Sequence, residues 1–139
     1  MEIKEKCNVV KLIFTEGWNQ EIFNSFSAFL ADSFVLHHWN KKIKTNRNAL
    51  RRIIRTWRDA FPDLYFEIVS ITGSEDMVAA NLVLHGTHTG TWKGIRPTRK
   101  KISVDHKFFF QFQNDKIEKI WEVNDEYGMR LQLAAVLKD

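Results

Sequence analysis

The stretch that decides the fold is residues 102–125, which read ISVDHKFFFQFQNDKIEKIWEVND. Apolar residues alternate with polar ones in two runs, 102–113 and 116–125, and a period of two predicts β-strands. Between them, Gln113, Asn114 and Asp115 form a short polar segment typical of a turn. The C-terminal part of the chain is therefore predicted to contain a β-hairpin.

Two further strands are expected upstream of this hairpin. Leu64, Phe66 and Ile68 alternate with less apolar neighbours, and residues 77–88 form a longer mixed strand. Residues 90–101 are rich in Gly, Thr, Pro and basic side chains, which favours a long hairpin loop. Four strands are thus predicted after Pro62, where the apolar period changes from nearly four to two.

The chain before Pro62 is predicted to be mainly helical. Apolar residues from Ile3 to Phe14 recur at spacings of four, three and four, so a first helix is expected to end near Gly17. Asn19 is a candidate N-cap for a second helix over 20–30, and 34–38 reads as a short strand. Thr45 is the candidate cap of a third helix that runs to residue 60, where Pro62 stops it.

The chain is expected to become helical again from Glu126, with Tyr127, Leu131 and Ala134 on one face. Helices first and hairpin-connected strands afterwards predict an α+β fold, in which helices cover one side of a bent, mostly antiparallel sheet. Such a curved sheet encloses a cone-shaped interior that is a natural small-molecule pocket. We expect residues 1–139 to form a single domain.

Composition narrows the function classes. The chain has 139 residues, 44% of them hydrophobic, which is enough to build a core in one domain. No apolar run approaches the length of a membrane span, and the N-terminus lacks the pattern of a secretory signal, so a cytoplasmic protein without a membrane partner is expected. The single Cys7 forms no internal disulfide. The formal charge of +4 is a weak signal, and no recognition motif accompanies it, so nucleic acid is not the expected partner.

One imidazole lies on an apolar row of the strand at 102–113. Alternation places His106 on the same face as Val104, Phe108 and Phe110. A histidine in this position is either a core residue satisfied by a backbone carbonyl or a group that faces the pocket. His106 is therefore a candidate catalytic residue, and Phe108 is a candidate pocket wall.

The same alternation in the last strand groups Ile117, Lys119, Trp121, Val123 and Asp125 on one face. A carboxylate beside Trp121 is partly desolvated, which can raise its pKa toward the range of a general acid or base. Asp125 can equally cap the helix that starts at Glu126, and the two roles are compatible.

The other histidines suggest pocket groups rather than a metal centre. His85 and His88 are three residues apart, but no third ligand stands at a recognisable spacing, so we expect no metal. His37 and His38 are adjacent in a strand, so only one of them can line a pocket. The isolated glycines form no nucleotide-binding pattern, and no cofactor is expected. Trp57 and Phe61 are candidate core residues or pocket walls.

Six segments, taken together, resemble one known family. They are Trp18-Asn19, residues 34–38, WRDAFPDL at 57–64, HGTHTG at 85–90, GIRPT at 94–98 and WEVNDEYG at 121–128. Their order along about residues 8–134 is similar to that of the SnoaL-like polyketide cyclases, also labelled ester cyclases, of the nuclear-transport-factor-2-like superfamily. The sequence departs from the family pattern at Arg99, where glycine is usual, and at His106, where small residues are common.

The resemblance implies a cone-shaped α+β barrel, commonly dimeric, that uses no cofactor or metal. It also implies that Asp125 matches the acid/base aspartate of the characterised cyclases, and it favours His88 and His38 as pocket residues. We therefore expect acid/base catalysis on a small, largely apolar carbonyl compound, either an intramolecular aldol cyclisation or an isomerisation.

In this interpretation Asp125, His88 and His106 are catalytic, and His38, Trp57, Phe61, Trp121 and Phe108 bind the substrate. The alternative is a non-catalytic protein that binds or carries a small molecule in the same pocket, since this superfamily contains both kinds. A homodimer is expected because Phe109 would lie among polar residues on the outer face of the sheet, where a second subunit can cover it.

Overall fold

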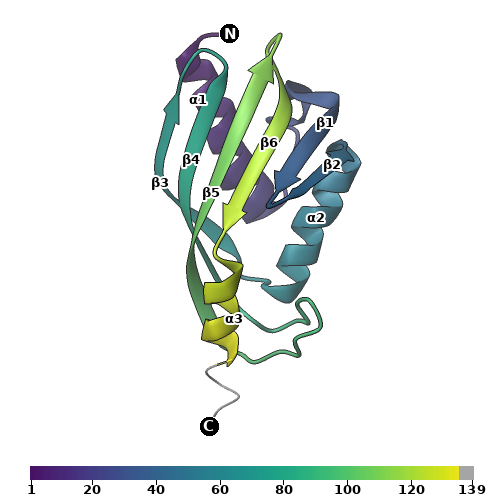
Figure 1. The fold of residues 1–139 in the computed structure, drawn as a ribbon, viewed down its shortest axis with the longest axis vertical. Helices are drawn as coiled ribbons and strands as arrows, with labels where there is room; N and C mark the ends of the chain where they lie inside the picture. The colour runs from purple at the N-terminus through teal and green to yellow at the C-terminus, as the bar shows by residue number, and fades with distance from the viewer. Residues whose placement is uncertain (135–139) are drawn as a thin grey trace.

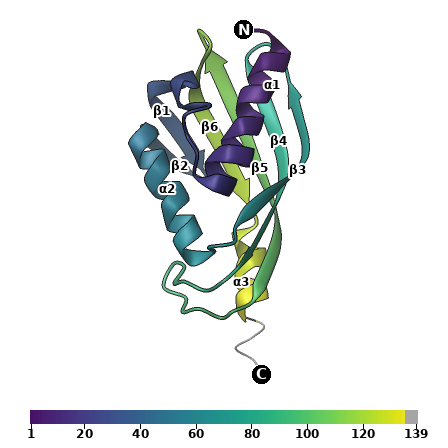
Figure 2. The same ribbon diagram turned by 180° about the vertical axis from the view of Figure 1, so that it is seen from behind.

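The structure is a computed structural model that describes residues 1–134. A six-stranded sheet has the strand order β2-β1-β6-β5-β4-β3, and helices α1 and α2 lie against one of its faces (Figures 1 and 2). The strands are β1 (Leu30–His38), β2 (Lys41–Thr45), β3 (Tyr65–Gly73), β4 (Met77–Thr87), β5 (Lys101–Gln113) and β6 (Lys116–Asn124). The helices are α1 (Ile3–Leu12), α2 (Arg47–Ala60) and α3 (Glu126–Ala134), with a π-helical turn at Ile13–Trp18 and a 3-10 turn at Ser27–Phe29.

The predicted fold class is confirmed: the protein is α+β with a curved, open and mostly antiparallel sheet. The pair of β1 and β6 is parallel, and the other neighbouring pairs are antiparallel. The inner face of the sheet and the apolar faces of α1 and α2 form one core rich in aromatic side chains, among them Phe14, Phe34, Phe66 and Phe110. None of the helices within residues 1–134 is long and apolar enough to cross a membrane.

The predicted second helix over 20–30 is wrong. The chain turns there, with Glu21 in the left-handed region at φ 58°, and β1 already begins at Leu30. Asn19 does not cap a helix, because its side chain pairs with the backbone of Phe66, accepting from the N–H at 2.7 Å and donating to the carbonyl at 3.2 Å. Phe23 and Phe26 are buried, but they pack into the core from this non-helical segment.

Strand β2 was not predicted. Its sequence KKIKT is polar, and four of its five residues are exposed, so no alternation marks it. The cap of α2 also differs from the prediction: Asn46, not Thr45, accepts a hydrogen bond from the backbone N–H of Ala49 at 2.9 Å.

The last helix forms where expected but turns a different face inward. Met129 and Leu133 are buried, whereas Tyr127 and Leu131 are 72% and 52% exposed. Met129 and Leu133 are four residues apart, so they share the face of α3 that packs against the protein. Asp125 Oδ1 caps the first turn by accepting from the N–H of Gly128 at 2.8 Å.

Two of the motif segments pack directly against each other. The backbone N–H groups of Thr89 and Gly90 both donate to the carbonyl of Ala60, at 3.1 and 3.0 Å. A side chain at position 90 would start 2.1 Å from the carbonyl oxygen of Asp59, so only glycine allows this approach. The contact joins the end of α2 to the loop that follows β4, at the end of the sheet where α3 also lies (Figure 1).

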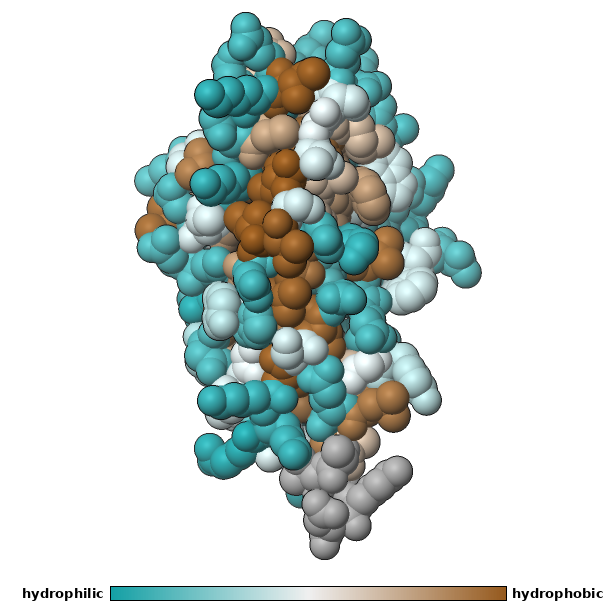
Figure 3. Space-filling model, turned by 90° about the vertical axis from the view of Figure 1, so that its left-hand side faces the viewer, coloured by the Kyte–Doolittle hydropathy of each residue, from teal (hydrophilic) through white to brown (hydrophobic). Residues whose placement is uncertain are grey.

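An apolar band runs along the side of the molecule formed by α1 and the edge strand β3 (Figure 3). The exposed large hydrophobic residues of these two elements are Ile3, Tyr65 and Val69. Val69 lies where the β3–β4 register shifts between Ile68 and Ser70. Such an irregularity bends an edge strand and weakens its ability to pair with another chain.

We expect Asn46→Ala to lower the free energy of unfolding by about 1 kcal/mol, because the first turn of α2 loses its side-chain acceptor. Asn46→Ser retains an acceptor and should stay close to the parent. Urea denaturation of the three proteins measures the effect. A loss of the same size in both variants would show that the cap is not the cause.

Candidate functional site

A buried carboxylate joins two histidines on the inner face of the sheet. Glu122 Oε2 lies 2.7 Å from His106 Nε2, and Glu122 Oε1 lies 3.0 Å from His38 Nδ1. The His106 side chain is 1% exposed, that of Glu122 is 11% exposed and that of His38 is 23% exposed. The cluster therefore runs from the closed interior to a partly open end at His38.

Three neighbouring strands bring these residues together. Glu122 on β6 pairs with His38 on β1 and with Phe108 on β5, so the three residues form one row across the sheet. His106 lies opposite Asn124 in the next row. Side chains of directly opposed residues stand side by side on the same face, which is why residues far apart in sequence meet here.

The two histidines keep Glu122 ionised. Burial alone raises the pKa of its carboxyl, but hydrogen bonds and charge from His106 and His38 outweigh burial and lower the pKa from its ordinary value of 4.5 to about 2. An ionised carboxylate only accepts hydrogen bonds, so both imidazole nitrogens that face it must donate. A neutral His38 then has its lone pair on Nε2, and a neutral His106 has its lone pair on Nδ1.

Aromatic rings surround His106. Phe108 stacks on it with ring centroids 4.9 Å apart, and Phe66 and Trp57 meet it edge-on at 5.0 and 6.4 Å. Next to this cluster lies a small cavity of about 20 Å³ whose wall includes Trp18, Phe108 and Glu122. A cavity of this size holds about one water molecule, so a larger ligand requires the walls to move apart.

Four predicted site residues are thus brought together: His106, His38, Phe108 and Trp57. Phe61 extends the same aromatic cluster, with its ring centroid 6.2 Å from that of Trp57.

His88 packs on the far side of Phe61, at 5.3 Å between ring centroids, and is fully buried. Its Nδ1 accepts from the backbone N–H of Thr98 at 3.2 Å, so His88 fastens the loop between β4 and β5. Burial lowers the pKa of His88, although hydrogen bonds with the backbone of Gly90 and Ile95 act in the opposite direction. A neutral ring in this position suits a structural contact.

The predicted row of Trp121 and Asp125 does not face the interior. Trp121 stacks on His37 on the outer face of the sheet, with ring centroids 4.7 Å apart, and Asp125 is exposed at the cap of α3. The register of β5 and β6 shifts where Gln111 opposes Lys119 and Phe112 opposes Ile117, which leaves one extra residue on β6. After this irregularity Ile120, Glu122 and Asn124 point inward.

Sequence reasoning therefore missed Glu122. One signal was available in the spacing of three between Ile117 and Ile120, which breaks strict alternation and indicates a change of face.

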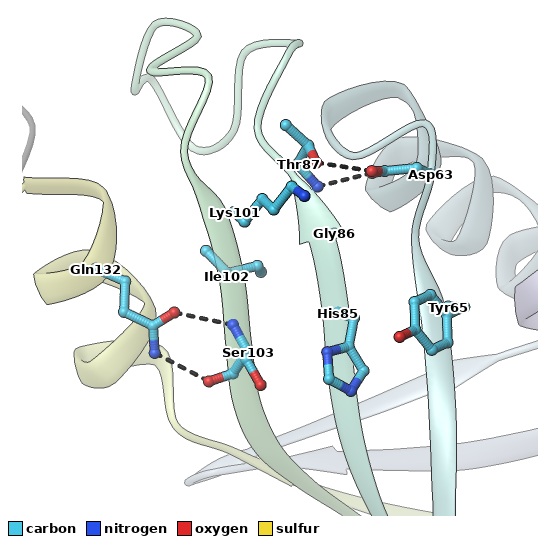
Figure 4. A pocket seen from close by; sticks show the side chains of 9 residues that line it. All are labelled: Asp63, Tyr65, His85, Gly86, Thr87, Lys101, Ile102, Ser103 and Gln132. Carbon is cyan, nitrogen blue, oxygen red and sulfur yellow. Dashed lines mark hydrogen bonds between the residues drawn. The ribbon is translucent and has the colours of Figure 1, made fainter.

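A wider depression of about 470 Å³ lies on the outer side, between β3, β4, β5 and α3 (Figure 4). Its polar groups are largely paired with each other. The Asp63 carboxylate accepts from the N–H and hydroxyl of Thr87, both at 2.7 Å, and the Gln132 amide pairs with the backbone of Ser103. The buried cluster at Glu122, which retains lone pairs for chemistry, is the better candidate for a catalytic centre.

Within residues 1–134 no three His, Cys, Asp or Glu side chains gather closely enough to hold a metal ion. The candidate site therefore consists of the Glu122 carboxylate, its two imidazoles and their aromatic surroundings.

Solved structures show the same fold at low sequence identity. A protein assigned as a SnoaL-like polyketide cyclase from Jannaschia sp. CCS1 is 18% identical, with a TM-score of 0.86 over 96% of this chain and 94% of its own. One assigned as a polyketide cyclase from Acidithiobacillus ferrooxidans is 22% identical, with a TM-score of 0.81 over 98% and 99% of the two chains. AclR from Streptomyces galilaeus, assigned as a hydroxylase, is 21% identical, with a TM-score of 0.83 over 96% and 83%.

These likenesses establish the fold alone, and among curated proteins there is no significant match. The family model for SnoaL-like polyketide cyclases, however, matches residues 8–133, which is nearly the whole chain. On that match, this chain belongs to the SnoaL-like polyketide cyclase family.

Proposed function

We propose that the protein catalyses cofactor-independent proton transfer on a small, largely apolar carbonyl compound bound in its interior, as an aldol-type cyclisation or an isomerisation. The observation that carries the proposal is the buried, ionised Glu122, which is hydrogen-bonded to both His38 and His106. An ion in an apolar interior costs free energy unless its partners compensate, and strongly perturbed ionisable groups cluster at functional sites. The cluster around Glu122 is therefore a candidate functional site.

His38 is the proposed base. Glu122 accepts the Nδ1–H of His38, which fixes the tautomer with a free lone pair on Nε2 and stabilises the imidazolium that forms when His38 takes a proton. The His38 side chain is 23% exposed, so it can return the proton to solvent or to the product. Trp57, Phe61 and Phe108 supply apolar walls that orient a conjugated substrate.

Asp125 and His88 remain predictions as catalytic residues, but their surroundings favour structural roles. Asp125 already accepts the N–H of Gly128 at the start of α3, and His88 fastens a loop. Trp121, on the outer face, is better suited to a contact between subunits than to substrate binding.

The second candidate function is a carrier that binds an apolar small molecule without changing it. The cavity beside Glu122 favours it, because its wall is almost wholly apolar, with side chains such as Phe34, Leu36 and Leu50. Measurement of binding and of proton transfer on the same protein separates the two functions.

We also propose that the protein is a homodimer that pairs through the outer face of the sheet, the face turned toward the viewer in Figure 1. Phe109 and Trp121 are directly opposed there, and Val123 is 47% exposed. Lys119 precedes this apolar patch along β6 and Asp125 follows it. Two copies with antiparallel β6 strands therefore bring opposite charges together.

We expect the parent protein to accelerate the exchange of α-protons for deuterium in small aryl ketones such as 1-tetralone, as followed by NMR. Glu122→Gln should slow the exchange on the order of 100-fold, because His38 loses the carboxylate that orients and stabilises it. Asp125→Asn retains the cap of α3 and should keep the parent rate. Loss of exchange in Asp125→Asn with full exchange in Glu122→Gln would refute the roles assigned to Glu122 and His38. If the proteins bind the ketone and none of the three exchanges its protons, the carrier function is favoured.

Stability should depend on the ionisation of Glu122. The pKa of its carboxyl is lowered to about 2 in the folded protein, so the folded state resists protonation. The stabilisation is complete above the ordinary pKa of about 4.5 and is lost as the pH falls toward about 2. Denaturation midpoints measured across this window should fall less steeply in Glu122→Gln than in the parent. Ile117→Val, a core change that removes no charge, should lower the whole curve and keep the parent slope.

The parent should sediment as a dimer at micromolar concentration. Val123→Lys places a charge in the proposed contact and should yield a folded monomer, whereas Val69→Lys on the edge strand should remain dimeric. Analytical ultracentrifugation checks all three proteins, with thermal melts to verify folding. A monomeric parent would remove the proposal.

A further inference from the structure

Basic residues are concentrated in one part of the chain. Residues 33–58 contain eight Lys or Arg residues and no Asp or Glu. Of the 21 basic residues the rest of the chain has the other 13, against all 17 acidic ones, so it is net negative. The basic segment covers β2 and most of α2, which follow each other directly and lie on the same side of the molecule (Figures 1 and 2). Charge separated in this way attracts an anionic partner to that side of the protein.

The lysines of β2 are available to such a partner. On α2, three of the arginines pair with the carboxylates of Asp32 or Glu21. Lys41, Lys42 and Lys44 of β2 are exposed, and within residues 1–134 none of them pairs with a carboxylate. The charge that the protein itself leaves uncompensated therefore includes all three lysines of this strand.

Two large apolar side chains are exposed beside these lysines. Trp39 is 65% exposed and Ile43 is 44% exposed. Trp39 lies in the two-residue turn between β1 and β2 and has φ 56°, in the left-handed region that favours glycine. A bulky residue in this conformation, with most of its ring in water, costs free energy in the isolated protein. Burial of the ring against a partner would recover part of that cost.

The position of β2 at the border of the sheet lets these groups reach one surface together. β2 pairs with β1, and its other edge pairs with no strand of the described residues. Ile43 opposes Leu36 on the inner face, whereas Lys42 opposes His37 on the outer face. Long side chains from both faces of an edge strand can extend past the edge, so apolar and basic groups can touch the same partner.

The combination of groups selects the partner. Lysines attract negative charge, tryptophan favours the boundary between water and hydrocarbon, and isoleucine favours hydrocarbon, which together match the surface of an anionic bilayer. A nucleic acid would use the lysines and could stack a base on Trp39, but it offers no apolar environment to Ile43. A second copy of the chain would bring the same three lysines, and like charges disfavour that contact.

We propose that the β1–β2 hairpin, residues 38–44, attaches the protein to an anionic lipid surface. Trp39 and Ile43 enter the interfacial layer, and the three lysines of β2 contact the headgroups. The expectation of no membrane partner rests on the lack of a long apolar run, but attachment to a lipid surface needs none. Because Trp39 directly follows His38, the partly open end of the candidate site lies next to the lipid in this arrangement.

The test measures sedimentation of the full-length protein with two kinds of vesicle. One kind is phosphatidylcholine with about 30% phosphatidylserine, and the other is phosphatidylcholine alone. The parent should bind the anionic vesicles and leave the neutral ones unbound. Replacement of Lys41, Lys42 and Lys44 by Gln should weaken binding on the order of 100-fold, because each lysine at an anionic surface contributes about fivefold. Equal binding of the parent to both kinds of vesicle would overturn the proposal.

A second triple variant is the matched control for net charge. Lys4→Gln, Lys11→Gln and Lys100→Gln remove the same charge from exposed positions outside the hairpin. This variant should bind anionic vesicles within about threefold of the parent, because its lysines lie away from the proposed contact. If both triple variants lose binding equally, only net charge matters and the hairpin is not the attachment element.

Trp39→Gly tests the apolar part of the contact. Glycine favours the backbone conformation at this position, so the variant should fold, as a thermal melt verifies. It should bind anionic vesicles on the order of tenfold more weakly than the parent, because no ring enters the interfacial layer. Tyr65→Ala removes an exposed aromatic ring from the opposite edge strand and should retain the parent affinity. Parent-like vesicle binding by Trp39→Gly would contradict the proposal.

Titration with single-stranded poly(dT) distinguishes the other class of anionic partner. If the parent binds the oligonucleotide but not the anionic vesicles, the basic segment is a nucleic-acid interface and the proposal fails. It fails equally if the parent binds neither. The exchange of α-protons is measured without vesicles, so loss of exchange removes the proposed function alone, and loss of vesicle binding removes the membrane attachment alone.

Discussion

The ionised carboxylate of Glu122 is the constraint on which the interior depends. An uncompensated charge there would cost several kcal/mol, so His38 and His106 have to stay within hydrogen-bonding distance of it. These contacts connect β1, β5 and β6 across the sheet at the register in which His38 and Phe108 both oppose Glu122. It also fixes which nitrogen of each imidazole has a lone pair, so one ion organises both the packing and the chemistry of the cavity.

Much of the architecture could be predicted from the sequence, because it depends on repeated local patterns. The apolar periodicities around Ile3–Leu12 and Arg47–Ala60 predict two of the helices, and the alternation of apolar and polar residues predicts β3 to β6. The predictions failed for elements that are stabilised by contacts with other parts of the chain. Strand β2 has no apolar alternation and forms because β1 pairs with it, and the turns after Asn19 are held by a contact with Phe66 that lies 47 residues away.

The site was predicted only in part, for one physical reason. A strand has a period of two, so a single irregularity moves every later residue to the opposite face. Gln111 and Phe112 are consecutive on β5, but they oppose Lys119 and Ile117, so β6 has one extra residue there. Beyond it, Glu122 and Asn124 point inward and Trp121 points outward. All three lie in the segment that carries the family resemblance. His106 was placed correctly because it lies on the regular part of β5. His38 was selected on the family resemblance and not on alternation, which left His37 and His38 equally open.

The strand order has a consequence for how the chain reaches this structure. Among the six strands of the described residues, β6 comes last along the chain, yet it lies between β1 and β5, and the contact between Glu122 and His38 spans 84 residues. A growing chain can form the β1–β2 hairpin and the β3–β4–β5 meander early, but these two pieces cannot join until β6 has left the ribosome. Folding is therefore expected to be slow for a protein of this size, since it must close a long loop before the core is complete. The edges of β1 and β5 stay open until then, so the nascent protein is most vulnerable to aggregation just before its interior cavity forms.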